Sequence, residues 1–144
     1  MMRGIRGKDT GPERMVRCLL HRRGFRFRLH ARDLPGHPDI VFPRFHAVVL
    51  VHGCFWHGHD CPLFRLPGTR REFWEAKIAR NRLNDSLNAR ALADLGWRVA
   101  TVWECALRGK SRMTPDAMAD ALAQWLHGST PTLVLSSVPD EGGG

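Results

Sequence analysis

The sequence contains no apolar run of the ~18 residues that a membrane-spanning helix requires. No signal-peptide pattern opens the chain, and no segment of it is repeated. These absences argue against a membrane or a secreted protein, so we expect a cytoplasmic one. The 144 residues, 43% of them hydrophobic, are enough for one hydrophobic core, and we expect a monomer.

Acidic residues are scarce relative to basic ones. The 14 Asp and Glu residues face 22 Lys and Arg residues, which gives a formal net charge of +8. Such an excess of positive charge favours a polyanionic partner, and nucleic acid is the usual one. Most of the cations are arginine, whose planar group suits phosphate and guanine better than lysine does. Solubility alone is the alternative explanation for this charge.

Cysteines are few, and four of them in a reducing compartment are more typical of metal ligands or core thiols than of disulfides. Cys18 lies in a predicted helix, and we expect it to be packed as an apolar residue. Two others lie in the stretch 52–61, His-Gly-Cys-Phe-Trp-His-Gly-His-Asp-Cys. Its mixture of metal ligands, large aromatics and glycines suits neither a core strand nor an ordinary surface loop.

Three ligands of a tetrahedral zinc site could come from this stretch, namely Cys54, His59 and Cys61. The best donor of a fourth is Cys105, which follows a predicted strand. The spacing alone leaves His57 open as a replacement for His59. A closed site with four protein ligands would be structural, and unliganded cysteines are the less favoured alternative.

Capping signals and hydrophobic periodicity predict a mixed α/β fold in which helices cover the faces of a central sheet. The expected elements are a helix over 10–24, strands over 25–29, 39–42 and 45–51, a helix over 72–95, a strand over 97–104 and a helix over 114–128. The run 45–51 has no polar alternation, which predicts a central strand buried on both faces. We expect one domain over 1–128, with 1–9 as a flexible basic arm and 129–144 as a disordered tail.

The helix over 72–95 is expected to direct most of its large apolar residues to the core. The expected core positions are Phe73, Ile78, Leu83, Leu87 and Leu95, and the expected solvent face carries Lys77, Arg80, Arg82, Asp85 and Arg90.

Asp39 is the leading catalytic acid, because it begins a strand directly after a Pro-Gly-x-Pro turn. A carboxylate there suits Mg²⁺, which prefers oxygen ligands and assists phosphodiester cleavage. His52 and His57 follow the neighbouring strand and could transfer protons near neutral pH. A turn-capping role is the alternative for Asp39, and a capping box explains Glu13 without any catalytic role.

Phe55 and Trp56 lie inside the histidine-rich stretch, and we do not expect core residues in such a metal-binding loop. Large apolar side chains beside a basic surface can unstack base pairs, and unstacking costs least at a mispair. Trp74 could join them or pack on the sheet. The remaining tryptophans, Trp97, Trp103 and Trp125, follow strand or helix periodicity and are expected in the core.

Several of these segments together resemble one family, the very short patch repair (Vsr) DNA mismatch endonucleases. The segments are Gly53-Cys54-Phe55-Trp56-His57-x-His59-x-Cys61, Pro38-Asp39, Glu72-Phe73-Trp74, Gly96-Trp97-Arg98-Val99 and 102–109. The resemblance implies a restriction-endonuclease-like fold and a nick on the 5′ side of the thymine in T·G mispairs. It also implies that the reaction depends on Mg²⁺, with two ions at the site. Such mispairs arise when 5-methylcytosine deaminates.

The resemblance also assigns roles to single residues. It makes Asp39 and the backbone carbonyl of Val51, where the family commonly has threonine, the Mg²⁺ ligands. It makes His52 a contact to the scissile phosphate, His57 the general base and Glu13 a support for the water around the metal. The implied zinc ligands are Cys54, His59, Cys61 and Cys105, the implied wedge beside the mismatch is Phe55, Trp56 and Trp74, and the implied groove contacts of the arm are Met2 and Ile5.

Three functions compete on these grounds. The first is a mismatch-nicking endonuclease with Mg²⁺ and a structural Zn²⁺, acting on double-stranded DNA with a T·G mispair, alongside mismatch-repair proteins and a repair polymerase. The second is a zinc-stabilised module that only binds DNA, and it would not need Asp39, His52 and His57 together at strand ends. The third is a nuclease of the same fold without mismatch preference, against which the aromatic wedge argues.

Overall fold

The computed structural model describes residues 11–59, 61 and 66–137. This part of the chain forms three α-helices and five strands, with three consecutive strands between the first two helices and short 3-10 turns after two of the strands. Their bounds are α1 Gly11–Arg22, β1 Arg28–Leu29, β2 Ile40–Phe42, η2 Pro43–Phe45, β3 Ala47–His52, α2 Arg71–Asp94, β4 Arg98–Trp103, η3 Glu104–Ala106, α3 Pro115–His127 and β5 Thr132–Leu135. No helix in the described residues is long and apolar enough to cross a membrane. The predicted mixed α/β fold is confirmed.

The strands form one mixed sheet in the order β1-β2-β3-β4-β5. The pairs β1–β2 and β2–β3 are antiparallel, whereas β3–β4 and β4–β5 are parallel. Strand β3 is therefore the centre of the sheet, as its unbroken apolar run predicts, and residues 47–50 are buried. The parallel register pairs His52 with Trp103, so the segments that follow β3 and β4 leave the sheet at the same edge.

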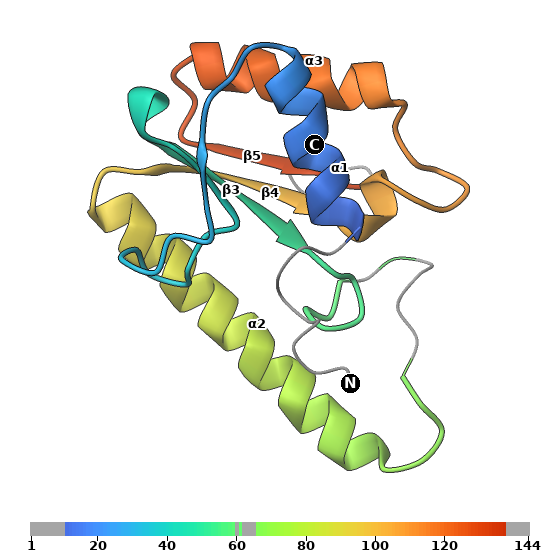
Figure 1. Cartoon of the computed structure of the whole chain (residues 1–144). Coiled ribbons are helices and arrows are strands. Elements are labelled where there is room, and N and C mark those ends of the chain that lie inside the picture. The colour runs from blue at the N-terminus through green and yellow to red at the C-terminus, as the bar shows by residue number, and fades with distance from the viewer. Residues whose placement is uncertain (1–10, 60, 62–65, 138–144) are drawn as a thin grey trace.

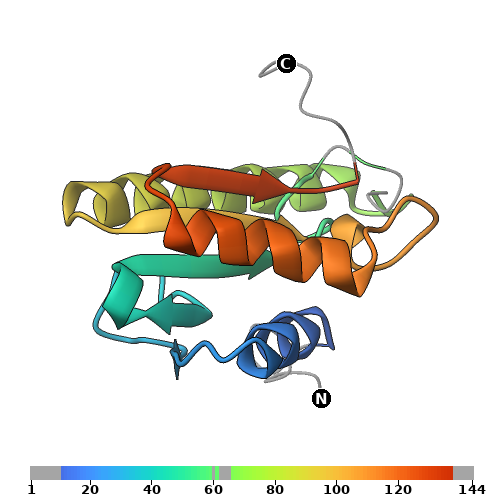
Figure 2. The same cartoon turned by 90° about the horizontal axis from the view of Figure 1, so that it is seen from above.

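Helices cover both faces of this sheet. Helices α1 and α3 pack on one face, where Leu20, Phe42, Val49 and Leu122 belong to the larger core cluster. Helix α2 covers the other face, and its Leu92 packs in the second cluster. Figures 1 and 2 show α2 across the sheet from α1 and α3, with its N-terminal half extending away from the strands.

The predicted core face of α2 was largely wrong. Ile78 is buried, but the side chains of Phe73, Leu83, Leu87 and Leu95 are 45%, 59%, 56% and 58% exposed. The helix meets the rest of the protein along the stripe that carries Ile78, Asp85 and Leu92, at the i and i+7 spacing of one helix face. The larger apolar residues lie on the opposite face. The face of α2 that is buried is therefore the one that meets the sheet, and not the one that carries the most leucines.

The predicted disordered tail was also wrong for its first part. Residues 132–135 form β5, which pairs in parallel with β4, and Leu135 is buried in the larger core cluster. A fifth strand covers the edge of β4 that would otherwise leave its backbone groups unpaired. Residues 138–144 lie outside the described part of the chain. The predicted cap of α3 is confirmed, because the Thr114 hydroxyl accepts a hydrogen bond from the Ala117 amide.

Cysteine and tryptophan burial differs from expectation at three positions. Cys18 is exposed on α1, so it is not the packed thiol that its helical position predicted. Trp125 is 5% exposed in the core, as expected, but Trp97 and Trp103 are only partly buried. Trp103 ends β4, and its ring faces the histidines that follow β3.

Candidate functional site

Chemically active side chains gather where β3 and β4 end. Among the described residues, three groups of His, Cys, Asp and Glu side chains bring their ligand atoms within 4.8 Å of one another. They are the cysteine group Cys54, His59, Cys61 and Cys105, the imidazole group His52, His57 and Asp85, and the acidic group Glu13, His30 and Asp39.

The cysteine group forms because the loop after β3 folds back beside the turn after β4. Nδ1 of His59 lies 3.6 Å from Sγ of Cys54 and 3.6 Å from Sγ of Cys105. Tetrahedral zinc with Zn–S bonds of ~2.3 Å and Zn–N bonds of ~2.0 Å separates such atoms by about 3.6 Å. The donor set and spacing therefore fit a closed tetrahedral metal site. The structure brings His59, and not His57, into this group.

Two contacts hold the cysteine group in place. The ring of His59 stacks on Trp103 with centroids 4.2 Å apart, which fixes the direction of Nδ1. The Cys54 amide donates to Oε1 of Glu104, 3.2 Å away. Burial, followed by the nearby thiols of Cys61 and Cys105, raises the pKa of the Cys54 thiol. A bound cation would oppose that effect, because thiolates are the metal-binding form of cysteine.

Asp39 lies at the start of β2, against the end of β3. Its Oδ2 accepts a hydrogen bond from the Val51 amide at 2.7 Å, so the carboxylate is held beside the backbone of residue 51. The pKa of Asp39 is raised to about 7 in total. Burial has the largest effect and raises it, the hydrogen bond from the Val51 amide lowers it, and the charge of Glu13 raises it. A partly buried carboxylate with an acidic neighbour is stabilised by a cation, so the site fits a hard divalent ion.

Glu13 is more than a helix cap. Its side chain is 1% exposed, and its Oε2 lies 2.7 Å from Nε2 of His30 and 3.2 Å from Nη1 of Arg17. A capping glutamate would be expected at the helix surface, whereas this one points from the first turn of α1 toward Asp39. The capping partner Thr10 lies outside the described residues. Glu13 thus belongs to the acidic group.

The imidazole group pairs the two histidines with an aspartate of α2. The rings of His52 and His57 stack with centroids 3.9 Å apart, and Nδ1 of His57 lies 2.5 Å from Oδ2 of Asp85. Burial, and then the charge of His57, lowers the pKa of His52 to about 4, so His52 is neutral at physiological pH. Within the described residues, Nδ1 of His52 is buried and has no hydrogen-bond partner.

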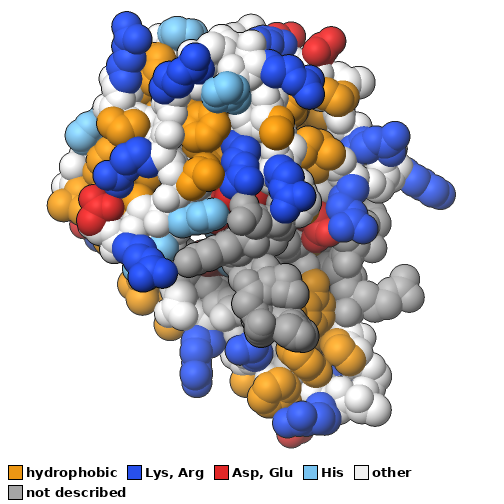
Figure 3. All heavy atoms as spheres, in the orientation of Figure 1, with side chains coloured by type: hydrophobic (Ala, Val, Ile, Leu, Met, Phe, Trp, Pro, Cys, Tyr) orange, Lys and Arg blue, Asp and Glu red, His pale blue; other side chains and the backbone are white. Residues whose placement is uncertain are grey.

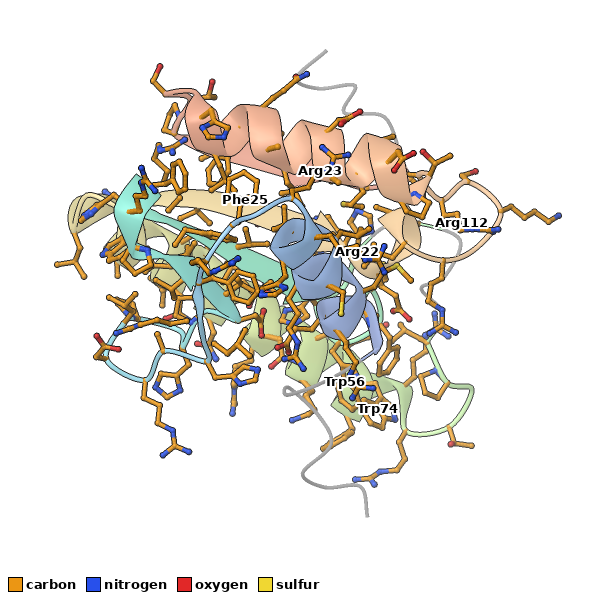
Figure 4. All side chains as sticks on the ribbon, turned by 45° about the horizontal axis from the view of Figure 1, so that its top comes forward. Arg22, Arg23, Phe25, Trp56, Trp74 and Arg112 are labelled. Atoms are coloured by element: carbon orange, nitrogen blue, oxygen red, sulfur yellow. The ribbon has the colours of Figure 1, made fainter. Side chains whose placement is uncertain are left out.

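The three predicted wedge residues lie together. Phe55 lies 5.0 Å from Trp56 and 5.5 Å from Trp74 between ring centroids, and the two indoles are 5.9 Å apart. Trp56 is 42% exposed. Figure 4 shows Trp56 and Trp74 close together at the N-terminal end of α2. Trp74 therefore joins the loop aromatics instead of packing on the sheet.

Basic side chains prevail over acidic ones on the face of the molecule seen in Figure 3, where Lys and Arg are widely spread and Asp and Glu are few. This distribution agrees with the net charge of +8 and with a polyanionic partner. The arm residues Met2 and Ile5 lie outside the described residues, so their predicted DNA contacts stay predictions.

Sequence reasoning missed three residues of this region. Asp85 was assigned to the solvent face of α2, although its spacing of seven from both Ile78 and Leu92 places it on the buried stripe. Trp103 was assigned to the core. Glu104 was given no role, although its position one residue before Cys105 is a signal that its carboxylate could reach the cysteine loop.

Known proteins match the chain over most of its length. The family described as DNA mismatch endonuclease Vsr matches residues 1–63. The chain is 45% identical over 127 residues to the DNA mismatch endonuclease Vsr of Escherichia coli, covering 88% of this chain and 81% of that protein. It is 55% identical over 107 residues to the type II nicking enzyme V.XorIIP of Xanthomonas oryzae pv. oryzae, covering 74% and 79%. The chain therefore belongs to the Vsr family of DNA mismatch endonucleases.

Proposed function

We propose that this endonuclease nicks double-stranded DNA on the 5′ side of the thymine in T·G mispairs, within a restriction-endonuclease-like fold and as a monomer. The observation that carries the proposal is the proximity of a partly buried acid, a histidine–aspartate pair and a partly exposed aromatic cluster around the end of β3. The E. coli relative is named a mismatch endonuclease, which supports the same substrate class here.

Asp39 and the carbonyl of Val51 would hold Mg²⁺, with Glu13 supporting its water shell, and the cysteine group would hold a structural Zn²⁺. Mg²⁺ supplies charge stabilisation for the phosphate and lowers the pKa of a water molecule. The zinc site fixes the loop that carries the histidines and the aromatics. Nothing in that arrangement requires the zinc to contact the substrate.

His57 is suited to act as the general base. Its Nδ1 faces the carboxylate of Asp85, so Nδ1 carries the proton and Nε2 keeps a lone pair to accept one from water. His52 stacks on His57 and is neutral, so it can donate one hydrogen bond to a phosphate oxygen without adding charge. The two histidines therefore divide proton acceptance and phosphate contact between them.

The aromatic cluster of Phe55, Trp56 and Trp74 would provide mismatch preference. Inserting large rings beside a base pair costs unstacking energy, and that cost is lowest where pairing is already weak. The alternative of a zinc module that only binds DNA leaves the histidine–aspartate pair without a role. A nuclease without mismatch preference would leave the partly exposed cluster of Phe55, Trp56 and Trp74 without a role.

The test is a nicking assay on a T·G duplex with Mg²⁺, using the wild type and Asp39→Ala. We expect the variant to bind the duplex in a mobility-shift assay but to nick it at least ~10³-fold more slowly, because it lacks the metal-binding carboxylate. Asp94→Ala, an exposed aspartate of α2, is the control. Undiminished nicking by Asp39→Ala would contradict the mechanism.

A further inference from the structure

His30 lies directly opposite Asp39 where β1 and β2 end. The antiparallel register pairs Arg28 with Val41 and Leu29 with Ile40, and the next step brings His30 level with Asp39. The His30 amide donates to the Asp39 carbonyl at 2.9 Å. The backbone thus places an imidazole beside the proposed metal-binding carboxylate.

The side chain of His30 is directed into the acidic group. Its Nε2 lies 2.7 Å from Oε2 of Glu13, and the ligand atoms of Glu13, His30 and Asp39 all lie within 4.8 Å of one another. Adjacent ligands of an octahedral ion with bonds of ~2.1 Å lie about 3 Å apart, and opposite ones about 4 Å apart. The three side chains therefore span a space of the right size for one divalent ion.

The burial of Glu13 also favours a cation at this place, because a carboxylate that is 1% exposed needs charge compensation. His30 and Arg17 lie against it. Nε2 of His30 therefore lies where a donor to an ion between the two carboxylates would have to lie.

We propose that His30 is a nitrogen ligand of the metal at Asp39, and that this site binds Mn²⁺ or Co²⁺ in preference to Mg²⁺. The inference rests on the proposed role of Asp39 as a metal ligand. Imidazole favours the later first-row ions, whereas Mg²⁺ gains least from a nitrogen donor. A mixed set of carboxylates and one imidazole therefore shifts the preference of the site away from Mg²⁺.

The test measures metal binding by the zinc-loaded protein without DNA. Mn²⁺ is titrated and followed by electron paramagnetic resonance, and pulsed measurements on bound Mn²⁺ detect ¹⁴N coupling from a coordinated imidazole. We expect His30→Gln to lose that ¹⁴N coupling and to bind Mn²⁺ at least ~10-fold more weakly. Its Mg²⁺ affinity, measured by competition, should change by less than about threefold.

Two variants guard against a folding artefact. His30 has a φ of 49°, which asparagine tolerates well, so His30→Asn preserves the backbone while removing Nε2. His37→Asn makes the same change at an exposed histidine with a φ of 47° and should bind Mn²⁺ as the wild type does.

The outcomes separate this inference from the proposed function. If Asp39→Asn abolishes Mn²⁺ binding but both His30 variants keep wild-type affinity and ¹⁴N coupling, the inference is wrong and Asp39 remains a metal ligand. If Asp39→Asn and the His30 variants all bind as the wild type does, both the inference and the proposed metal site are overturned.

Discussion

Nδ1 of His57, in the loop after β3, lies 2.5 Å from Oδ2 of Asp85 in the middle of α2. The side chains are 24% and 26% exposed, so the pair is partly shielded from solvent. It links the loop that carries the zinc ligands and the aromatics to the helix that covers the sheet. The orientation of His57 therefore depends on a residue 28 positions away in the sequence.

Asp85→Asn should slow nicking by roughly 10²–10⁴-fold while leaving DNA binding intact, because an amide no longer fixes the tautomer of His57 or stabilises its protonated form. Single-turnover nicking with saturating enzyme measures the chemical step. Asp94→Asn on the same helix is the control. An Asp85→Asn protein with the wild-type rate would exclude the pair from catalysis.

Cys105→Ser should reduce zinc content well below about one ion per chain and lower the melting temperature by about 10 °C, because a closed site contributes folding free energy. Elemental analysis and calorimetry measure the two effects. Cys18→Ser removes an exposed thiol outside the cysteine group and should change neither. Full zinc content in Cys105→Ser would show that this thiol is not a ligand.

Trp56→Ala and Trp74→Ala should each reduce the ratio of T·G to T·A nicking rates by about 5–100-fold, since stacking of one base on an aromatic ring contributes ~1–3 kcal/mol. The matched control is Leu83→Ala, which removes a 59% exposed side chain from α2. A ratio that stays at the wild-type value in both tryptophan variants would show that these side chains do not provide the mismatch preference.

The lowered pKa of His52 makes stability depend on pH in a defined window. Because the pKa falls from 6.5 to about 4 on folding, the unfolded chain binds more protons between these values. The contribution of His52 is therefore complete above pH 6.5 and decreases by up to about 3 kcal/mol as the pH falls toward 4. Urea unfolding of wild type and His52→Gln from pH 4.5 to 7.5 measures it. Parallel curves for the two proteins would contradict the prediction.

The centre of the fold was predictable, but its periphery was not. An unbroken apolar run such as 45–51 has few alternatives to a central strand, and it forms β3. In α2, apolar residues occur on two faces, and only the position of the sheet decides that Leu92 is buried and Leu87 exposed. The strand β5 is short, and its pairing with β4 depends on contacts distant in sequence.

The site was predictable where its ligands are neighbours in sequence. The ligand types in 52–61 indicated a metal loop, and the structure brings them together with Cys105. Asp85 could not be identified from the local sequence, because its role depends on which face of α2 meets the loop. Glu13 had a sufficient local explanation as a cap, and only tertiary packing shows it buried against His30.

The central claim is that the partly exposed cluster of Phe55, Trp56 and Trp74 and the catalytic side chains act together on a mispair. The most direct measurement is the single-turnover nicking rate of two duplexes that differ only in a T·G or a T·A pair, with each strand labelled separately. The account predicts one nick, on the 5′ side of the mispaired thymine, and at least ~100-fold slower cutting of the matched duplex. Equal rates on the two duplexes, or cutting of both strands, would contradict it.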